Sequence, residues 1–208
     1  MPAPAELRYA LQWSAQTGQA RLEWQHDAAH YRLTLRADGR GAPLWQQSSS
    51  GGFDVAGLAP ERFVDSRRGR GALAANFQRA SGRITFSGPR VEYPAWPGAQ
   101  DRLSWIVQLA AIANAAGQVP PQVALFVVDG RGVGDVWSFV NQGAVVVDTP
   151  HGPVLATHVM RQPQRLMDWR VDAWLDAQRG HWPVRLRMTV PRAGMVFELQ
   201  LSTEATSP

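Results

Sequence analysis

The segment that decides the fold is GAQDRLSWIVQLAAIANAAG, residues 98–117. Elsewhere in the chain, apolar residues come in short alternating runs broken by glycine, proline and aspartate. Here they crowd into one stretch that has almost no polar side. Pro97-Gly98 before the stretch and Gly117 after it are typical start and stop signals. We therefore predict one α-helix over about residues 100–116.

This helix is expected to lie in the interior of the protein. About 17 residues at ~1.5 Å each reach only ~25 Å, whereas a membrane span needs about 20 predominantly apolar residues. We therefore predict no transmembrane span, and a helix that is apolar nearly all round is typically buried. Asp101 and Ser104 are predicted to cap its first turn, because their side-chain oxygens accept hydrogen bonds from free backbone N–H groups there.

The rest of the chain is predicted to consist of strands. Apolar and polar residues alternate at period two through residues 6–93 and again through residues 121–203. Between the strands, Ser48-Ser49-Ser50-Gly51-Gly52 is short enough for a hairpin loop. Residues 123–128 are apolar on both faces, which favours a central strand.

The predicted fold class is mainly β. We expect a single domain over residues 1–208, with residues 1–5 as a disordered, linker-like tail. A large antiparallel meander would curl into an incomplete barrel or spiral around the one central helix, because so many strands must limit their exposed edges.

Composition excludes several classes of function. The 21 basic residues are all arginine, but 17 acidic residues are mixed among them, and a net charge of +4 is too mild to indicate nucleic-acid binding. The absence of cysteine excludes disulfides and thiolate metal sites. Met1–Ala5 shows no signal-peptide pattern.

No stretch of the sequence predicts catalysis. His26 and His30 flank a short turn, but a third metal ligand is missing. Asp129–Gly134 is rich in glycine, but it lacks the G-x-G-x-x-G spacing and precedes a strand, which indicates a hairpin turn. We predict no catalytic residue, no metal and no cofactor, so the protein is not expected to be an enzyme.

Two apolar stripes run along the predicted helix, and a single sheet covers only one of them. The second stripe must meet a wrapped-over strand, a partner or a ligand. We predict a hydrophobic ligand cleft on the concave side of the sheet. Its predicted residues are Trp105, Leu109, Ile112, Phe86 and Trp137.

A compact basic turn offers a second contact. Arg67, Arg68 and Arg70 lie between two predicted strands, and we expect them to touch an anionic headgroup or a partner. Trp174 shares its strand face with charged residues. We assign it to the same contact, because an amphipathic ring suits a partly solvent-exposed surface.

The segment PGAQDRLS, residues 97–104, followed by a short apolar helix, resembles the central signature of domain-of-unknown-function family 3108, a family of proteobacterial envelope proteins. Three flanking segments are similar to that family in order and spacing: GLAPERF (57–63), VVDTPHGPVLATHVMR (146–161) and DAWLDAQRGHWPVRLRMT (172–189). The resemblance implies a periplasmic protein, or one anchored to the membrane and facing the periplasm. It also implies a curled, incomplete barrel similar to the LolA and LolB lipoprotein carriers, and it supplies no catalytic residues.

Two functions follow as expectations. The first is a non-catalytic envelope protein that binds a lipid, a lipoprotein acyl chain or a peptide in the concave side of the sheet. The alternative is an envelope-integrity scaffold with a fully packed concavity, which binds an envelope protein partner and no small ligand. An apolar cleft left open beside the helix would favour the first.

Overall fold

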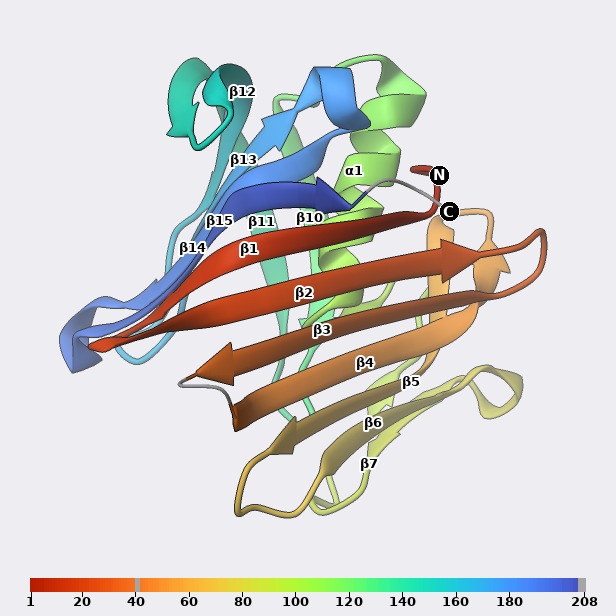
Figure 1. Cartoon of the computed structure of the whole chain (residues 1–208). Helices are drawn as coiled ribbons and strands as arrows, with labels where there is room; N and C mark the ends of the chain where they lie inside the picture. Colours follow the sequence, from red (N-terminus) through yellow and green to blue (C-terminus); the bar gives the residue numbers. More distant parts are fainter. Residues whose placement is uncertain (40–41, 206–208) are drawn as a thin grey trace.

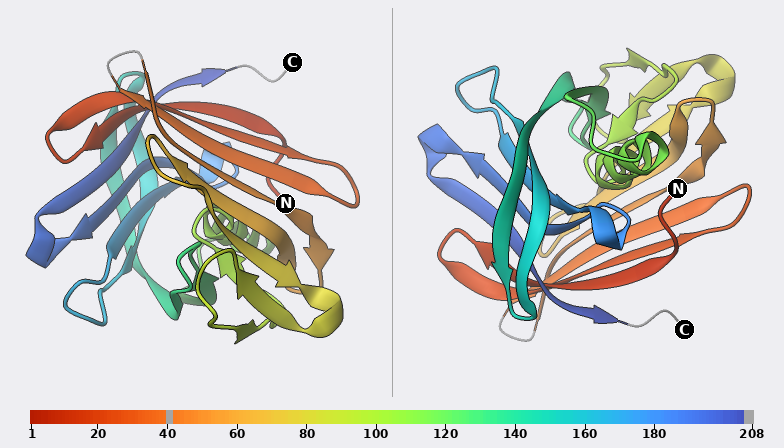
Figure 2. Two further views of the ribbon diagram at one scale, coloured as in Figure 1. Left: turned by 90° about the horizontal axis from the view of Figure 1, so that it is seen from below. Right: turned by 90° about the horizontal axis from the view of Figure 1, so that it is seen from above.

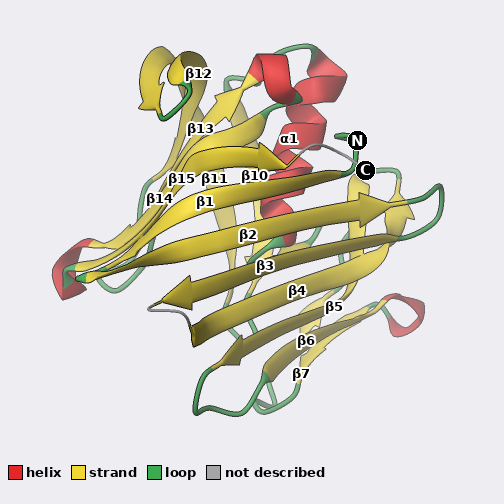
Figure 3. Ribbon diagram, viewed as in Figure 1, coloured by secondary structure: helices red, strands yellow, loops and turns green. Residues whose placement is uncertain are grey.

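The computed structural model describes residues 1–39 and 42–205. In this part of the chain, one fifteen-stranded sheet curls around a single α-helix, α1 (Ser104–Ala116) (Figures 1 and 3). The strands in chain order are β1 (Ala5–Trp13), β2 (Gln16–His26), β3 (Tyr31–Gly39), β4 (Ala42–Asp54), β5 (Gly57–Arg67), β6 (Leu73–Gln78), β7 (Arg83–Phe86), β8 (Tyr93–Pro94), β9 (Gln100–Asp101), β10 (Gln122–Val128), β11 (Gly134–Thr149), β12 (Gly152–Arg161), β13 (Arg170–Asp176), β14 (Trp182–Val190) and β15 (Met195–Ala205). The predicted fold class is confirmed.

The first and last strands of the chain lie in the middle of the sheet. β1 pairs with both β2 and β15, so the first and last strands of the chain lie side by side. From there β2 to β8 follow in order to one edge, and β14 back to β9 follow to the other. Every neighbouring pair is antiparallel except β9 and β10, which are parallel. In the end-on views the sheet encloses α1 on its concave side (Figure 2).

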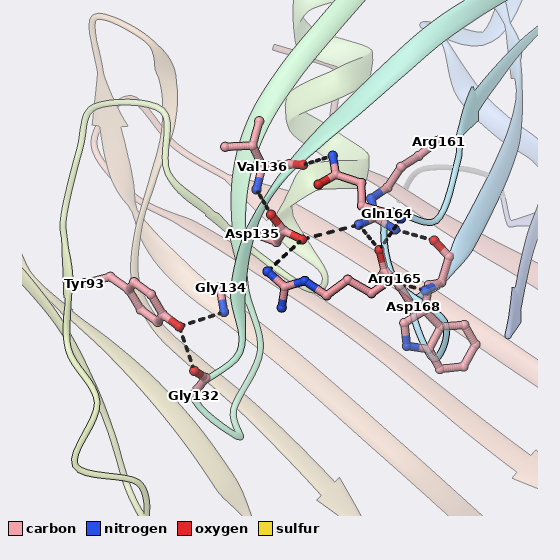
Figure 4. A network of polar contacts seen from close by, with 10 residues as sticks. Tyr93, Gly132, Gly134, Asp135, Val136, Arg161, Gln164, Arg165 and Asp168 are labelled. Atoms are coloured by element: carbon pink, nitrogen blue, oxygen red, sulfur yellow. Dashed lines mark hydrogen bonds and ion pairs between the residues drawn. The ribbon is translucent and has the colours of Figure 1, made fainter.

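Side chains connect the β8 edge of the open sheet to β10 and the turn that follows it. The Tyr93 hydroxyl of β8 donates to the carbonyl oxygen of Gly132 at 3.0 Å and accepts from the amide of Gly134 at 3.2 Å (Figure 4). The rings of Tyr93 and Phe126 pack edge to face, with centroids 5.4 Å apart. Tyr93 therefore links the edge strand β8 to β10 and to the turn between β10 and β11, one strand in from the β9 edge.

The core fills the space between the sheet and the helix. Leu103, Val107 and Leu109 have no exposed surface, and neither do Trp24 and Phe63 on the facing strands. Along β1 and β2, buried and exposed positions alternate as the sequence predicts. One inner face of a large sheet therefore supplies most of the buried apolar area that stabilises the fold.

Two predicted boundaries were wrong. The helix begins at Ser104, because Gln100 and Asp101 pair with β10 as the short strand β9. The predicted loop over residues 48–52 lies inside β4. Its small side chains allow a close approach, since a Cβ on Gly51 would stand 2.2 Å from the carbonyl oxygen of Ala59.

Two other segments lie differently from the expectation. The strand over residues 123–128 is β10, which stands next to the short edge strand β9 and exposes Ala124. Residues 1–5 were expected to be a disordered tail, but Pro2 is buried and its carbonyl accepts a 3.1 Å hydrogen bond from the Trp24 indole. Ala5 already belongs to β1.

Candidate ligand cleft

An open cleft of about 180 Å³ lies beside the start of α1. Residues of β1, β3, β4, β5, β14 and β15 line it on the side of the sheet, and residues before and within α1 line it on the side of the helix. The turn after β10 and Trp169 complete the lining. Apolar side chains dominate the lining: Trp13, Leu35, Trp45, Phe63, Leu103, Trp105, Ile106, Trp169, Leu186, Met188, Met195 and Phe197. An apolar cavity of ~150 Å³ holds a benzene-sized molecule. The cleft therefore has room for a small apolar group or one end of an acyl chain.

Half-buried tryptophans stand in the walls of the cleft. Trp13, Trp45 and Trp169 are each partly exposed. Trp45 donates its indole N–H to Asp65 Oδ1 at 2.7 Å, and its ring packs edge to face on Phe197, with centroids 5.4 Å apart. A ring with one polar end and a broad apolar face suits a wall that meets both solvent and an apolar ligand.

Both carboxylates in the cleft already have partners. Asp65 forms an ion pair with Arg67 at 3.3 Å. Asp129 Oδ1 accepts hydrogen bonds from the backbone amides of Arg131 at 2.8 Å and Val133 at 2.9 Å. These contacts hold the acidic groups at the side of the cleft and satisfy their charge locally.

Arg102 is the charged residue on the helix side of the cleft. Among the described residues, its guanidinium makes no hydrogen bond and no ion pair; it lies over the Trp137 ring, 4.8 Å from the centroid, and 5.9 Å from that of Trp169. Burial lowers the pKa of Arg102 to about 10. That value still leaves the side chain protonated at neutral pH.

The backbone that carries Arg102 is fixed by a buried network. Asp101 Oδ1 accepts from the amides of Leu103 and Ser104 at 2.8 Å, and Ser104 Oγ accepts from the Asp101 amide at 2.9 Å. This reciprocal pattern is that of a capping box. Ser49 Oγ of β4 donates to Asp101 Oδ2 at 2.6 Å. Burial raises the pKa of Asp101 to about 6.

The five predicted cleft residues do not come together in one site. Trp105 lines the cleft, and Trp137 lies directly behind Arg102 with its ring centroid 5.8 Å from that of Trp105. Leu109 is fully buried one turn further along the helix, and Ile112 is half-buried beyond it. Of these four residues, Trp105 alone lines the cleft; Trp137 lines a neighbouring hollow, Leu109 lies in the core, and Ile112 packs against the core.

Phe86, the fifth predicted cleft residue, lies near the β8 edge. Its ring packs edge to face on Tyr93, with centroids 6.0 Å apart, and Tyr93 is the residue that links β8 to the turn after β10. Phe86 is not among the residues that line the cleft.

The four residues predicted to contact an anionic headgroup or a partner also lie apart. Arg67 lines the cleft, whereas Arg68 and Arg70 are exposed on the turn after β5. Trp174 lies on the outer face of the sheet, stacked on His158 at 4.7 Å and contacted by the Arg185 guanidinium at 4.8 Å. The basic turn and Trp174 therefore do not share a site.

The remaining sequence motifs form turns. Asp129–Gly134 joins β10 to β11, as predicted. Between β2 and β3, Asp27 Oδ1 accepts from the amides of Ala29 and His30, both at 2.7 Å. Within residues 1–39 and 42–205, no group of three or more His, Cys, Asp or Glu residues is arranged to hold a metal ion. No helix in the same ranges has the length and apolar character of a membrane span.

Sequence reasoning missed Arg102, Trp45 and Asp65 as site residues. The one available signal was the presence of Arg102 inside an otherwise apolar segment. Trp45 and Asp65 come together only because β4 and β5 pair, with Trp45 opposite Arg67. That contact depends on strand register, which local alternation does not fix.

An unclosed sheet curled around one helix, with an apolar cleft at the helix start, defines a barrel-like β protein. The chain belongs to the family DUF3108, described as a protein of unknown function, whose model matches residues 6–200. Membership in the family that the segment at residues 97–104 resembled is thus confirmed, while similarity to LolA is not shown.

A likeness to a solved structure supports the fold. That structure is the β-barrel-like protein of domain of unknown function DUF1849 from Brucella abortus. The alignment covers 100% of this chain and 99% of that chain, with a TM-score of 0.63 and 16% sequence identity. At that identity the likeness shows the fold alone. A comparison with curated proteins finds no match.

Proposed function

We propose that the protein is a non-catalytic binding protein of the cell envelope that holds the apolar part of an amphiphilic ligand in the cleft beside α1. The observation that supports this function is an open, mostly apolar cleft next to a helix whose residues 104–111 are all buried. A concave apolar site with a few polar groups is the usual form of a small-molecule site.

The lining is suited to a flexible apolar ligand. Met188 is half-buried and Met195 is 39% exposed, and both side chains line the cleft. Methionine adapts its shape at little cost, so walls built from it accept chains of varied shape. Covering the exposed apolar surface would stabilise the bound state by about 25 cal/mol per Å².

The ligand classes we propose are a lipid, an acyl chain of a lipoprotein or an apolar peptide. The cleft volume favours one acyl chain end over a complete phospholipid. The envelope location, facing the periplasm, is part of the proposal, and its support is the resemblance of residues 97–104 to a family of envelope proteins.

A second candidate function, a protein-interaction module, is favoured by a different surface. Val146 of β11 and Leu155 of β12 are cross-strand neighbours, and each is 66% exposed. Leu166 and Met167, in the segment between β12 and β13, are exposed to the same degree. Exposed apolar neighbours, such as Val146 and Leu155, favour a contact with a partner.

A blocking substitution tests the proposed function. Met188→Trp places a larger side chain in the cleft. Leu155→Trp makes a matched change on the exposed surface of β12. With 1-decanol as an uncharged probe in isothermal titration calorimetry, we expect the wild type and Leu155→Trp to bind equally. Met188→Trp should bind about tenfold more weakly or worse. No binding by the wild type up to the solubility of decanol would contradict the proposal.

A further inference from the structure

Arg102 stands between two adjoining hollows. It lines the cleft on one side and, on the other, a second hollow of about 180 Å³ whose lining includes Trp137, Asp135 and Asp168. A guanidinium in this position is reachable by a ligand that enters the cleft.

The neighbouring Arg161 has the ion-pair partner that Arg102 lacks among the described residues. Arg161 contacts the same Trp137 ring, 4.6 Å from the centroid, and is 1% exposed. It forms an ion pair with Asp168 at 2.7 Å and donates to the carbonyl oxygen of Trp169 (Figure 4). Two guanidinium groups thus share one indole, and one of them has a carboxylate within the ion-pair distance.

The nearby carboxylates are engaged elsewhere. Asp168 Oδ2 also accepts from the amide of Gln164 at 3.0 Å, and Asp168 Oδ1 accepts from the amide of Trp169 at 2.8 Å. Asp135 accepts from the amide of Val136 and faces Arg165 at 4.0 Å (Figure 4). The carboxylates of Asp168 and Asp135 therefore pair with Arg161 and Arg165. The guanidinium of Arg102 is left to donate hydrogen bonds to another acceptor.

Burial of the Arg102 guanidinium is unfavourable; Asp129, Asp168 and Asp65 offset part of this cost by attraction without a direct contact, and Arg161 adds repulsion. An anion that binds Arg102 directly supplies the hydrogen-bonded partner that these aspartates do not. A carboxylate is the matched partner, because the planar guanidinium donates two parallel hydrogen bonds to its two oxygens.

The charges of the cleft select the ligand's charge. The cleft is lined by three arginines (Arg67, Arg102 and Arg131) and two aspartates (Asp65 and Asp129). The lining therefore has an excess of one positive charge. A monoanion neutralises that excess, whereas a dianion meets repulsion from the aspartates.

We propose that Arg102 is the anion-binding residue of the cleft and that the ligand is a monoanionic amphiphile, with a carboxylate on Arg102 and an apolar chain against the tryptophan and methionine side chains of the lining. This inference rests on the proposed function, because it assigns the head group of the ligand that the cleft holds.

The test compares three ten-carbon probes, decanoate, 1-decanol and decyl phosphate, by isothermal titration calorimetry at low salt. The full chain, Arg102→Gln and Arg36→Gln are measured in parallel. Arg36 is exposed on β3 and does not line the cleft, so Arg36→Gln removes the same charge outside the site and is the matched control. We expect the wild type to bind decanoate about tenfold more tightly than decanol, and more tightly than decyl phosphate. Arg102→Gln should lose that preference and keep its decanol affinity, while Arg36→Gln should change both by less than about threefold.

The outcomes separate the two proposals. Equal affinity of the wild type for decanoate and decanol, unchanged in Arg102→Gln, would overturn the role of Arg102 and leave the proposed function standing. Tighter binding of decyl phosphate than of decanoate would overturn the monoanion. No binding of any probe would overturn the proposed function itself.

A measurement on the wild type alone covers the case in which Arg102→Gln does not fold. In NMR of decanoate labelled with ¹³C at the carboxyl carbon, the pKa of the bound carboxyl should fall below that of free decanoate, because a guanidinium partner favours the ionised form. A bound pKa equal to or above the free value would overturn the assignment.

Discussion

The two ends of α1 differ in how they meet the sheet. At its end, Asn114 Nδ2 donates to the carbonyl oxygen of Gly180 at 2.9 Å, Asn114 Oδ1 lies 2.8 Å from His181 Nδ1, and Ala113 has no exposed surface. At its start, Asp101 anchors the backbone to β4, yet an open cleft lies in front of Arg102.

The difference shows how one helix serves two purposes. Small residues, such as Ala110 and Ala113, let the later turns pack directly against the sheet. At the start, Arg102 keeps part of its surface exposed toward the open cleft, while Trp105 is 1% exposed and stacks on Phe139, with centroids 5.0 Å apart. We therefore expect substitutions in the packed region to cost stability, and substitutions in the cleft to cost binding.

Leu109→Ala should give the largest effect on stability. Leu109 is fully buried in the packed region, so its truncation leaves a cavity that costs about 4 kcal/mol. Met188→Ala, in the cleft wall, should cost less than about 1 kcal/mol because the side chain is half-buried beside open space. Urea unfolding of both variants checks the contrast. Similar losses would mean that the two regions are packed alike.

The pH dependence of stability should reveal the buried acid at the helix start. The folded pKa of Asp101 is raised by burial to about 6 from an ordinary 3.8, so the folded state binds more protons than the unfolded state between these values. The stability that this group contributes is complete below pH 3.8 and is lost as the pH rises through about 6.

Asp101→Asn removes this titration and keeps an oxygen acceptor for the amides of Leu103 and Ser104. Between pH 4 and pH 7.5, the wild type should lose about 2–3 kcal/mol of unfolding free energy relative to Asp101→Asn. Denaturant unfolding of both proteins at the two pH values measures the change. A constant difference, or one that moves in favour of the wild type, would show that Asp101 is not a costly buried anion.

At the other end of the helix, Asn114→Ala should cost about 1–2 kcal/mol, because it leaves the carbonyl of Gly180 and the imidazole of His181 without their partner. Its effect on decanoate affinity should be negligible, since this contact lies at the far end of the helix from the cleft. Weakened binding would show that the two ends are coupled. Thermal unfolding and calorimetry on the same sample separate stability from binding.

The smallest effect is expected on the outer face. Glu198 pairs with Arg185 at 2.6 Å and with Arg187 at 3.5 Å across neighbouring strands. Glu198→Gln should cost about 0.5 kcal/mol, as partly exposed ion pairs usually do. A loss above about 2 kcal/mol in urea unfolding would mean that this ladder supports the cleft wall.

Local patterns predicted most of the fold. Alternation at period two marked the strands, and the apolar segment between Gly98 and Gly117 marked the helix. The sequence did not reveal β9, because a two-residue parallel pairing with β10 depends on a distant strand. The small residues of Ser48–Gly52 resemble a loop, but in the folded chain they let β4 pass close to its neighbours.

The site was less predictable than the fold. Trp105 was predicted from helical spacing and lines the cleft, but Leu109 and Ile112, predicted with it, do not, and Leu103 and Ile106 line it instead. The exceptional position of Arg102 depends on Asp168, whose carboxylate pairs with Arg161. Which arginine pairs with Asp168 is decided by tertiary contacts, and the spacing of these residues in the sequence does not predict it.

The most direct test of the account follows the tryptophan indole N–H resonances by ¹H–¹⁵N NMR while decanoate is added. The cleft tryptophans, Trp13, Trp45, Trp105 and Trp169, should shift in a saturable way. Trp24, which is fully buried beside Pro2, and Trp182, at the start of β14, should stay in place. Shifts at Trp24 or Trp182 without shifts in the cleft set would contradict the account, and so would the absence of any shift.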